Sequence, residues 1–119
     1  MRIAVLCALL AGCLLNPAII TAAEFISVDE VRRGMKGYGL TVFVGTEIDT
    51  FQVAILGVRK STSWTDWDLI WGRLEGGPLA ETGIIAGMSG SPVYIDGRMI
   101  GAVGWGFGFA KEPLAGITP

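Results

Sequence analysis

The hexapeptide Gly87-Met88-Ser89-Gly90-Ser91-Pro92 (GMSGSP) is the stretch of this sequence that decides the fold. A serine hydroxyl attacks a carbonyl efficiently only when a base removes its proton and backbone N–H groups stabilise the developing oxyanion. Glycine-flanked turns supply such N–H groups, because residues without a Cβ let successive amides point into one cavity. The hexapeptide therefore predicts a nucleophile turn, with Ser89 as the nucleophile and the amides of Gly87 and Ser89 as the oxyanion hole.

A plain glycine-rich turn between two strands is the simpler interpretation of the same residues. The downstream sequence fits both interpretations, because residues 92–95 and 99–103 read as strands on either side of Asp96-Gly97. An Asp-Gly pair between two apolar runs is a strong signal for a two-residue hairpin with a primed turn. The hexapeptide is thus expected to lead directly into a β-hairpin.

Short β-branched and aromatic runs also precede the hexapeptide. We expect strands at residues 40–44, 49–58 and 69–74, a polar loop at 59–66 and a turn at 75–78. Residues 104–109 alternate glycine with aromatics, which predicts either a strand packed on the core or a groove lined by Trp105, Phe107 and Phe109. Six short strands with 18 glycines for turns and bulges predict an all-β fold, a small antiparallel barrel.

One short helix is expected before the strands. Ser27 and Glu30 have the spacing of a capping box, and Ile26 and Val31 that of a hydrophobic staple, with Gly34 as the stop. We expect this helix to run for one or two turns and to cover one end of the barrel.

Residues 1–23 have the composition of an export signal. Arg2 supplies a positive charge, residues 3–15 are apolar except for Gly12, and the small residues up to Ala23 suit cleavage before Glu24. The apolar run is shorter than the roughly 20 residues of a membrane-spanning helix. We therefore expect an exported domain in the periplasm or cell envelope, with no stable transmembrane segment after signal removal.

The residues that end at Cys13 also fit a lipoprotein signal, in which Cys13 is lipidated and begins the mature chain. Cleavage there would leave an apolar mature start that includes Leu14 and Leu15, whereas a lipid anchor is normally followed by a polar tether. The simple signal is the favoured interpretation.

Composition excludes several classes of function. The chain has 9 basic and 11 acidic residues, a net charge of −2, and no clustered basic run of the kind that nucleic acid binding needs. Its two cysteines, Cys7 and Cys13, both lie in the predicted signal, and its acidic residues have no metal-ligand spacing, so neither a metal nor a cofactor is expected. There is also no histidine, the usual general base.

Several blocks along the chain resemble the stage IV sporulation protein B peptidase family. The blocks are RGMKG at residues 33–37, FQVAILG at 51–57, TGIIAGMSGSPV at 82–93 and GRMIGAV at 97–103. The hexapeptide also resembles GDSGGP, the nucleophile motif of chymotrypsin-like peptidases. The block KEPLAGITP at 111–119 is similar to the broader branch of the family, which occurs in exported proteins of non-sporulating bacteria.

The resemblance implies a chymotrypsin-like serine peptidase barrel in residues 24–119, with peptide or protein substrates. Family members use a serine, a histidine and an acidic residue. Ser89 matches the serine, and Glu75 falls near the acidic position, one residue out of place and with Glu for Asp. An exposed turn glutamate is the commoner explanation of Glu75, and no residue matches the histidine.

Three outcomes are compatible with the missing histidine. A lysine at position 36, 60 or 111 could act as base if burial lowered its pKa, a longer form of the chain could supply the base, or catalysis could be lost. The sequence thus leaves two hypotheses. One is an endopeptidase-like domain that hydrolyses peptide bonds through Ser89 if a base is supplied, and the other is a non-catalytic exported module that binds a peptide or envelope protein.

Two further expectations concern the aromatic residues and the end of the chain. Trp64, Trp67 and Trp71 are spaced across a loop and a strand, which favours core and rim packing over carbohydrate stacking. The chain stops at Pro119 without a polar tail, so we expect a domain that is incomplete at its C-terminus.

Overall fold

The computed structural model describes residues 23–107 and 110–119. The predicted signal segment before Ala23, with its alternative lipidation site Cys13, lies outside the described residues, as does Phe109. No helix in the described ranges has both the length and the apolar character needed to span a bilayer.

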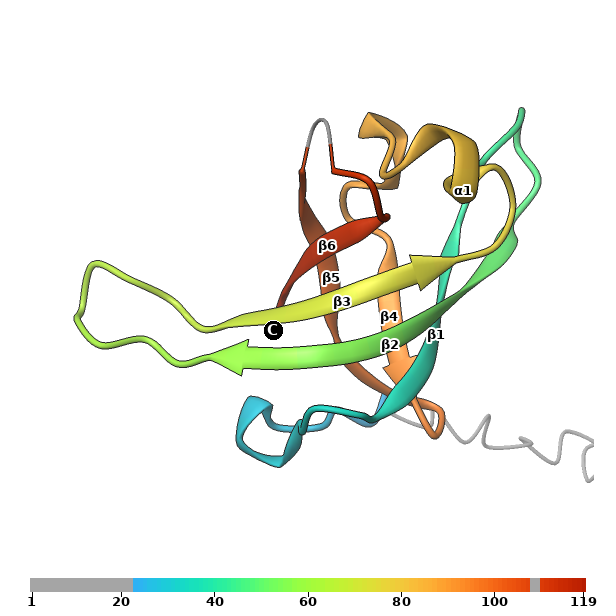
Figure 1. The fold of residues 1–119 in the computed structure, drawn as a ribbon. Helices are drawn as coiled ribbons and strands as arrows, with labels where there is room; N and C mark the ends of the chain where they lie inside the picture. The colour runs from blue at the N-terminus through green and yellow to red at the C-terminus, as the bar shows by residue number, and fades with distance from the viewer. Residues whose placement is uncertain (1–22, 108–109) are drawn as a thin grey trace, which may run out of the picture.

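Within this part of the chain, six antiparallel strands close into a barrel in the order β1-β2-β3-β6-β5-β4 (Figure 1). The strands are β1 (Lys36–Thr41), β2 (Asp49–Arg59), β3 (Leu69–Glu75), β4 (Pro92–Ile95), β5 (Arg98–Gly106) and β6 (Leu114–Thr118). The predicted all-β antiparallel barrel is confirmed.

Alternation of buried and exposed side chains builds the barrel core. On β2, Phe51, Val53 and Ile55 face inward and are buried, while Gln52 between them is exposed.

Pairing of β1 with β4, through Tyr38 opposite Tyr94, closes the sheet, and the two rings stack with centroids 5.3 Å apart. Closure leaves no free barrel edge along this seam.

Two short segments cover the two ends of the barrel (Figure 1). The 3-10 turn Val28–Glu30 lies at one end and brings Ile26 and Val31 into the hydrophobic core. At the other end lies α1 (Leu79–Thr82), whose Leu79 is fully buried. The expected end-covering helix is present as a single turn, because the extended backbone of Val31 ends it.

The predicted Ser27 cap is also present, with a different partner. The Ser27 hydroxyl accepts from the amide of Asp29 at 3.3 Å, and the Glu30 amide donates to the Ser27 carbonyl instead. The capping-box signal therefore predicts the position of the turn correctly. The hydrogen bond expected between the Ser27 hydroxyl and the Glu30 amide is replaced by one to the Asp29 amide.

The first strand differs from its prediction at residues 40–44, since β1 spans Lys36–Thr41. Gly37 and Gly39 lie inside it, before the predicted start at residue 40. A Cβ at Gly37 would collide with the Tyr94 carbonyl oxygen, and one at Gly39 would collide with the Phe51 ring. The glycines are needed because neighbouring groups approach the β1 backbone closely.

Two further elements were not expected from the sequence. Strand β6 lies between β3 and β5 and pairs Ile117 with Ile70 and with Val103. The helix α1 follows the predicted turn at 75–78.

The predicted Asp96-Gly97 hairpin is confirmed. The φ angles are 49° at Asp96 and 75° at Gly97, both positive as a type I′ turn requires.

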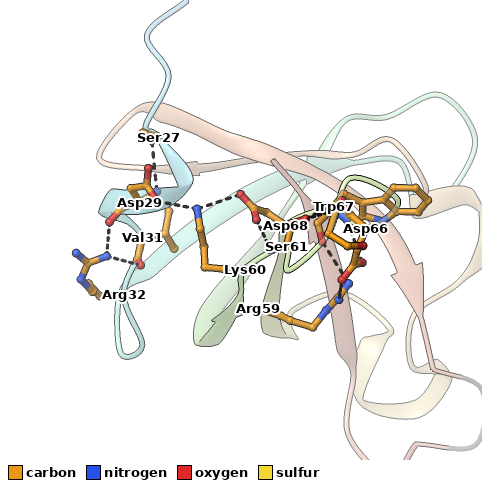
Figure 2. A network of polar contacts seen from close by, with 11 residues as sticks. Ser27, Asp29, Val31, Arg32, Arg59, Lys60, Ser61, Asp66, Trp67 and Asp68 are labelled. Atoms are coloured by element: carbon orange, nitrogen blue, oxygen red, sulfur yellow. Dashed lines mark hydrogen bonds and ion pairs between the residues drawn. The ribbon is translucent and has the colours of Figure 1, made fainter.

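The loop between β2 and β3 extends away from the barrel (Figure 1) and carries a network of polar contacts (Figure 2). Lys60 Nζ contacts Asp29 Oδ1 at 2.7 Å and Asp68 Oδ2 at 3.1 Å, which joins the loop to the N-terminal turn. The Ser61 amide donates to Asp68 Oδ1 at 2.7 Å. The Ser61 amide and the Lys60 ammonium together lower the pKa of Asp68.

Substitution of Gly39 tests the close packing of the Phe51 ring on β1. Gly39→Ala inserts a methyl group where the buried ring lies, and we expect a loss of about 1–3 kcal/mol in the free energy of unfolding. Gly57→Ala on β2 is the control, because a Cβ there meets nothing within 4 Å, and it should change stability by less than about 0.5 kcal/mol. Urea unfolding measures both, and equal effects would contradict this packing.

Acid titration tests the contact between Ser61 and Asp68. A lowered folded pKa means that the contact stabilises the loop above the ordinary aspartate pKa and is lost as pH falls through the lower, folded value. The NMR shift of the Ser61 amide should therefore titrate with a midpoint below 3.8. Asp68→Asn should remove this titration, and a midpoint above 3.8 in the wild type would contradict the contact.

Candidate functional site

The serine turn begins with one 3-10 turn at Ala86–Met88, between α1 and β4. Met88 is fully buried in the core, while the neighbouring Ser89 and Gly90 are exposed. Gly90 has φ of 84°, a left-handed conformation that glycine adopts without strain. The buried methionine thus anchors the turn and leaves the Ser89 side chain on the surface.

Hydrogen bonds join the turn to strands β5 and β1. The Gly90 amide donates to the Val103 carbonyl at 2.7 Å, and the Val103 amide donates to the Ser91 carbonyl at 2.9 Å. The Ser91 hydroxyl donates to Thr41 Oγ1 at 2.9 Å, and both residues are buried. Ser91 therefore has a structural partner in the core, while the nucleophile role of Ser89 stays a prediction.

Two hollows flank Ser89. The first, of about 410 Å³, lies between residues 84–86 and residues 103–106 of β5. The second, of about 390 Å³, lies between the turn, the end of β1 and Ile48. Of the described residues, Ser89 alone lines both hollows.

The edge of β5 beside the first hollow is open. Pairing of β5 with β4 reaches only as far as Ala102 opposite Pro92. Beyond it, Trp105 and Gly106 pair with β6, Gly104 lies at a register shift, and the other edge of these residues borders the hollow. Trp105 and Phe107 are 52% and 42% exposed, so the prediction that this aromatic run packs on the core is wrong for both.

One of the two amides predicted for the oxyanion hole, that of Ser89, is engaged within the turn. The Ser89 N–H donates to the Ala86 carbonyl at 3.2 Å. For this amide to stabilise an oxyanion, the Ala86 carbonyl must first release it. Gly87 is exposed, and a Cβ there would meet nothing within 4 Å, so the Ala86–Gly87 peptide has room to rotate. The oxyanion role of Gly87 and Ser89 stays a prediction.

No described residue that lines either hollow is ionisable. In the same part of the chain, no hydrogen bond joins the Ser89 hydroxyl to another side chain. Glu75 is exposed at the end of β3, opposite Gln52, and lines two other hollows, one shared with Lys36 and the other with Lys111. The structure does not bring Glu75 into either hollow beside Ser89, and its catalytic role stays a prediction.

The surroundings of Lys60 shift its pKa in the wrong direction for a general base. Its ammonium is hydrogen bonded to Asp29 and Asp68, and these contacts raise its pKa. A lysine base needs a lowered pKa so that the neutral amine is available near neutral pH. Lys60 is therefore a structural cation of the β2–β3 loop.

The site includes residues that sequence reasoning missed. Thr41 holds Ser91 from a distance of 50 residues along the chain. Val42 and Ile48 form an exposed apolar wall of the second hollow, at 37% and 75% exposure. No local pattern identifies these residues, because their role depends on how the barrel closes.

In a comparison with protein-family models, residues 14–117 match a family described as SpoIVB peptidase S55. Neither the curated proteins nor the solved structures give a significant match to this chain.

The buried hydroxyl pair can be tested by a double-mutant cycle. Thr41→Val leaves the buried Ser91 hydroxyl without its acceptor, which should cost about 1–3 kcal/mol of unfolding free energy. Adding Ser91→Ala should recover much of that loss, because no buried polar group is then left unpaired. Strictly additive effects in urea unfolding would contradict the contact, and Thr46→Val in an exposed loop serves as a neutral control.

Proposed function

The chain belongs to the SpoIVB peptidase family, and from that premise we propose that it binds an extended peptide across Ser89. Ser89 cleaves the bound peptide when a general base is supplied from outside this chain. The observation that carries the proposal is that Ser89 is exposed and lines both flanking hollows. A peptidase nucleophile needs substrate on both sides of the scissile bond, and this arrangement provides room for both.

The open edge of β5 supports binding in an extended conformation. An extended peptide can add to an exposed strand edge, where main-chain hydrogen bonds give affinity and side-chain hollows give specificity. Residues 104–106 offer such an edge beside Ser89. The glycines at 104 and 106 let the Thr118 and Ile84 side chains pack against the backbone of β5, so this part of the strand is held in place within the protein.

Cleavage depends on an external base because both hollows lack ionisable side chains in the described chain. A positioned base contributes about 10²–10⁴ to the rate of a reaction of this kind. The base would come from a longer form of the chain or from a partner protein. The exposed apolar wall of Val42 and Ile48 next to Ser89 gives such a partner a surface to cover.

A non-catalytic peptide-binding module is the second candidate function. Two observations favour it: no ionisable residue in the described ranges lines the two hollows beside Ser89, and the Ser89 amide is already bonded to the Ala86 carbonyl. In either case we propose that the domain works after export, in the periplasm or cell envelope, on a peptide or an envelope protein.

Chemical rescue separates the two candidates. Free imidazole can replace the missing base in hydrolysis of an acetyl-leucine p-nitrophenyl ester by the signal-free protein. We expect the rate difference between wild type and Ser89→Ala to grow with the concentration of neutral imidazole, recovering part of the roughly 10²–10⁴ that a base contributes. Stopped-flow absorbance of p-nitrophenolate measures the rate.

The matched control is Ser63→Ala, which removes an exposed serine of the β2–β3 loop and should behave as wild type. If wild type and Ser89→Ala hydrolyse the ester at the same rate at every imidazole concentration, catalysis by Ser89 is excluded. The non-catalytic module then stands as the function.

A further inference from the structure

A third hollow, of about 350 Å³, lies beside the first and shares Trp105 with it. Its walls are mostly aromatic and come from four parts of the chain: the end of β2, the β2–β3 loop, β3, and the end of β5 with the residue that follows it. The lining includes Arg59, Asp66, Trp67, Trp71, Trp105 and Phe107. The fold therefore gathers aromatic residues that the sequence separates by up to 40 positions.

The aromatic surface in this hollow is preassembled and uncovered. The rings of Trp71 and Phe107 pack against each other with centroids 5.1 Å apart. Trp67 is 57% exposed and Trp105 is 52% exposed, so their indoles are accessible to a ligand. Tryptophan residues in this situation are common centres of binding energy.

Polar contacts with Asp66 and Arg59 hold the backbone of Trp67 in place (Figure 2). The Trp67 amide donates to Asp66 Oδ1 at 3.0 Å, and Arg59 donates to Asp66 Oδ2 at 2.6 Å and to the Trp67 carbonyl at 3.3 Å. The backbone at Trp67 is therefore fixed before a ligand arrives, which reduces the entropy cost of binding. Because Arg59 and Asp66 are paired with each other, the hollow favours an uncharged occupant.

We propose that this aromatic hollow is a second specificity subsite, which takes an aromatic or large apolar side chain of the peptide that passes Ser89. The inference rests on the proposed peptide binding. Its basis is continuity: Trp105 is a wall of both hollows, and the open edge of β5 runs from the first hollow toward Phe107. An extended peptide advances by about 3.2–3.4 Å per residue. A side chain a few residues away from the one in the first hollow therefore reaches the aromatic hollow.

The test uses fluorescein-labelled peptides of alanine and serine that carry one leucine for the first hollow. In a second set, one phenylalanine stands two, three or four residues from the leucine, on either side. For wild type we expect at least one phenylalanine peptide to bind about three- to tenfold more tightly than the parent. Fluorescence anisotropy gives the dissociation constants.

Trp67→Ala should abolish this preference and leave the affinity for the parent peptide unchanged. Trp64→Ala is the matched control, because Trp64 is 95% exposed in the same loop and does not line the hollow. It should keep the preference in full.

The outcomes separate this inference from the proposed function. If wild type binds the parent peptide but phenylalanine gives no gain at any position, or if Trp67→Ala weakens both peptides equally, the second subsite is overturned and peptide binding stands. If no peptide binds wild type, both proposals fail. If the trimer of N-acetylglucosamine binds and Trp67→Ala removes that binding while no phenylalanine gain is seen, the hollow is a sugar site and the peptide subsite is overturned.

Discussion

Two hydrogen bonds between the serine turn and β5 organise the whole site. The Gly90 amide bonds to the Val103 carbonyl, and the Val103 amide bonds to the Ser91 carbonyl. They continue the β4–β5 ladder into the turn, so that Ser91 points inward to Thr41 while Ser89 stays at the surface. They also fix the course of β5, which then runs past Ser89 with one edge open. The surface position of Ser89 and the first hollow beside it are thus consequences of one local pairing.

This arrangement explains how a chain without histidine can keep the serine turn of its family in a defined conformation. Presentation of Ser89 depends on the buried Met88, the left-handed Gly90 and the pairing to β5, none of which involves a base. Activation of Ser89 is a separate requirement that needs a proton acceptor within hydrogen-bond reach. The described barrel meets the first requirement, and under the proposed function the base for the second comes from another polypeptide segment.

Local signals predicted most of the fold. The Asp96-Gly97 hairpin, the Ser27 cap and the alternation on β2 all act over a few residues, and the structure contains all three. The bounds of β1 were missed because Gly37 and Gly39 have a tertiary role, close approach of the Tyr94 backbone and the Phe51 ring, that resembles turn punctuation in a sequence. Strand β6 is only five residues long and has a glycine at its centre, so it carries little periodic signal.

The candidate site was predictable only in part, for a related reason. The hexapeptide identifies Ser89, but the partner of Ser91, the aromatic hollow and the surroundings of the lysines depend on barrel register and closure. The spacing of Trp64, Trp67 and Trp71 across a loop and a strand favours core and rim packing, but Trp64 and Trp67 are exposed, and Trp67 and Trp71 line the aromatic hollow. Only the β3–β6–β5 pairing brings them beside Trp105.

The central claim is that Ser89 is presented without being activated by this chain. Intact-mass analysis after treatment with a fluorophosphonate, across neutral to alkaline pH, tests the claim directly. The account predicts no adduct on Ser89 in the signal-free protein alone. Stoichiometric labelling that is lost in Ser89→Ala would contradict it, because it would require a base within the chain itself.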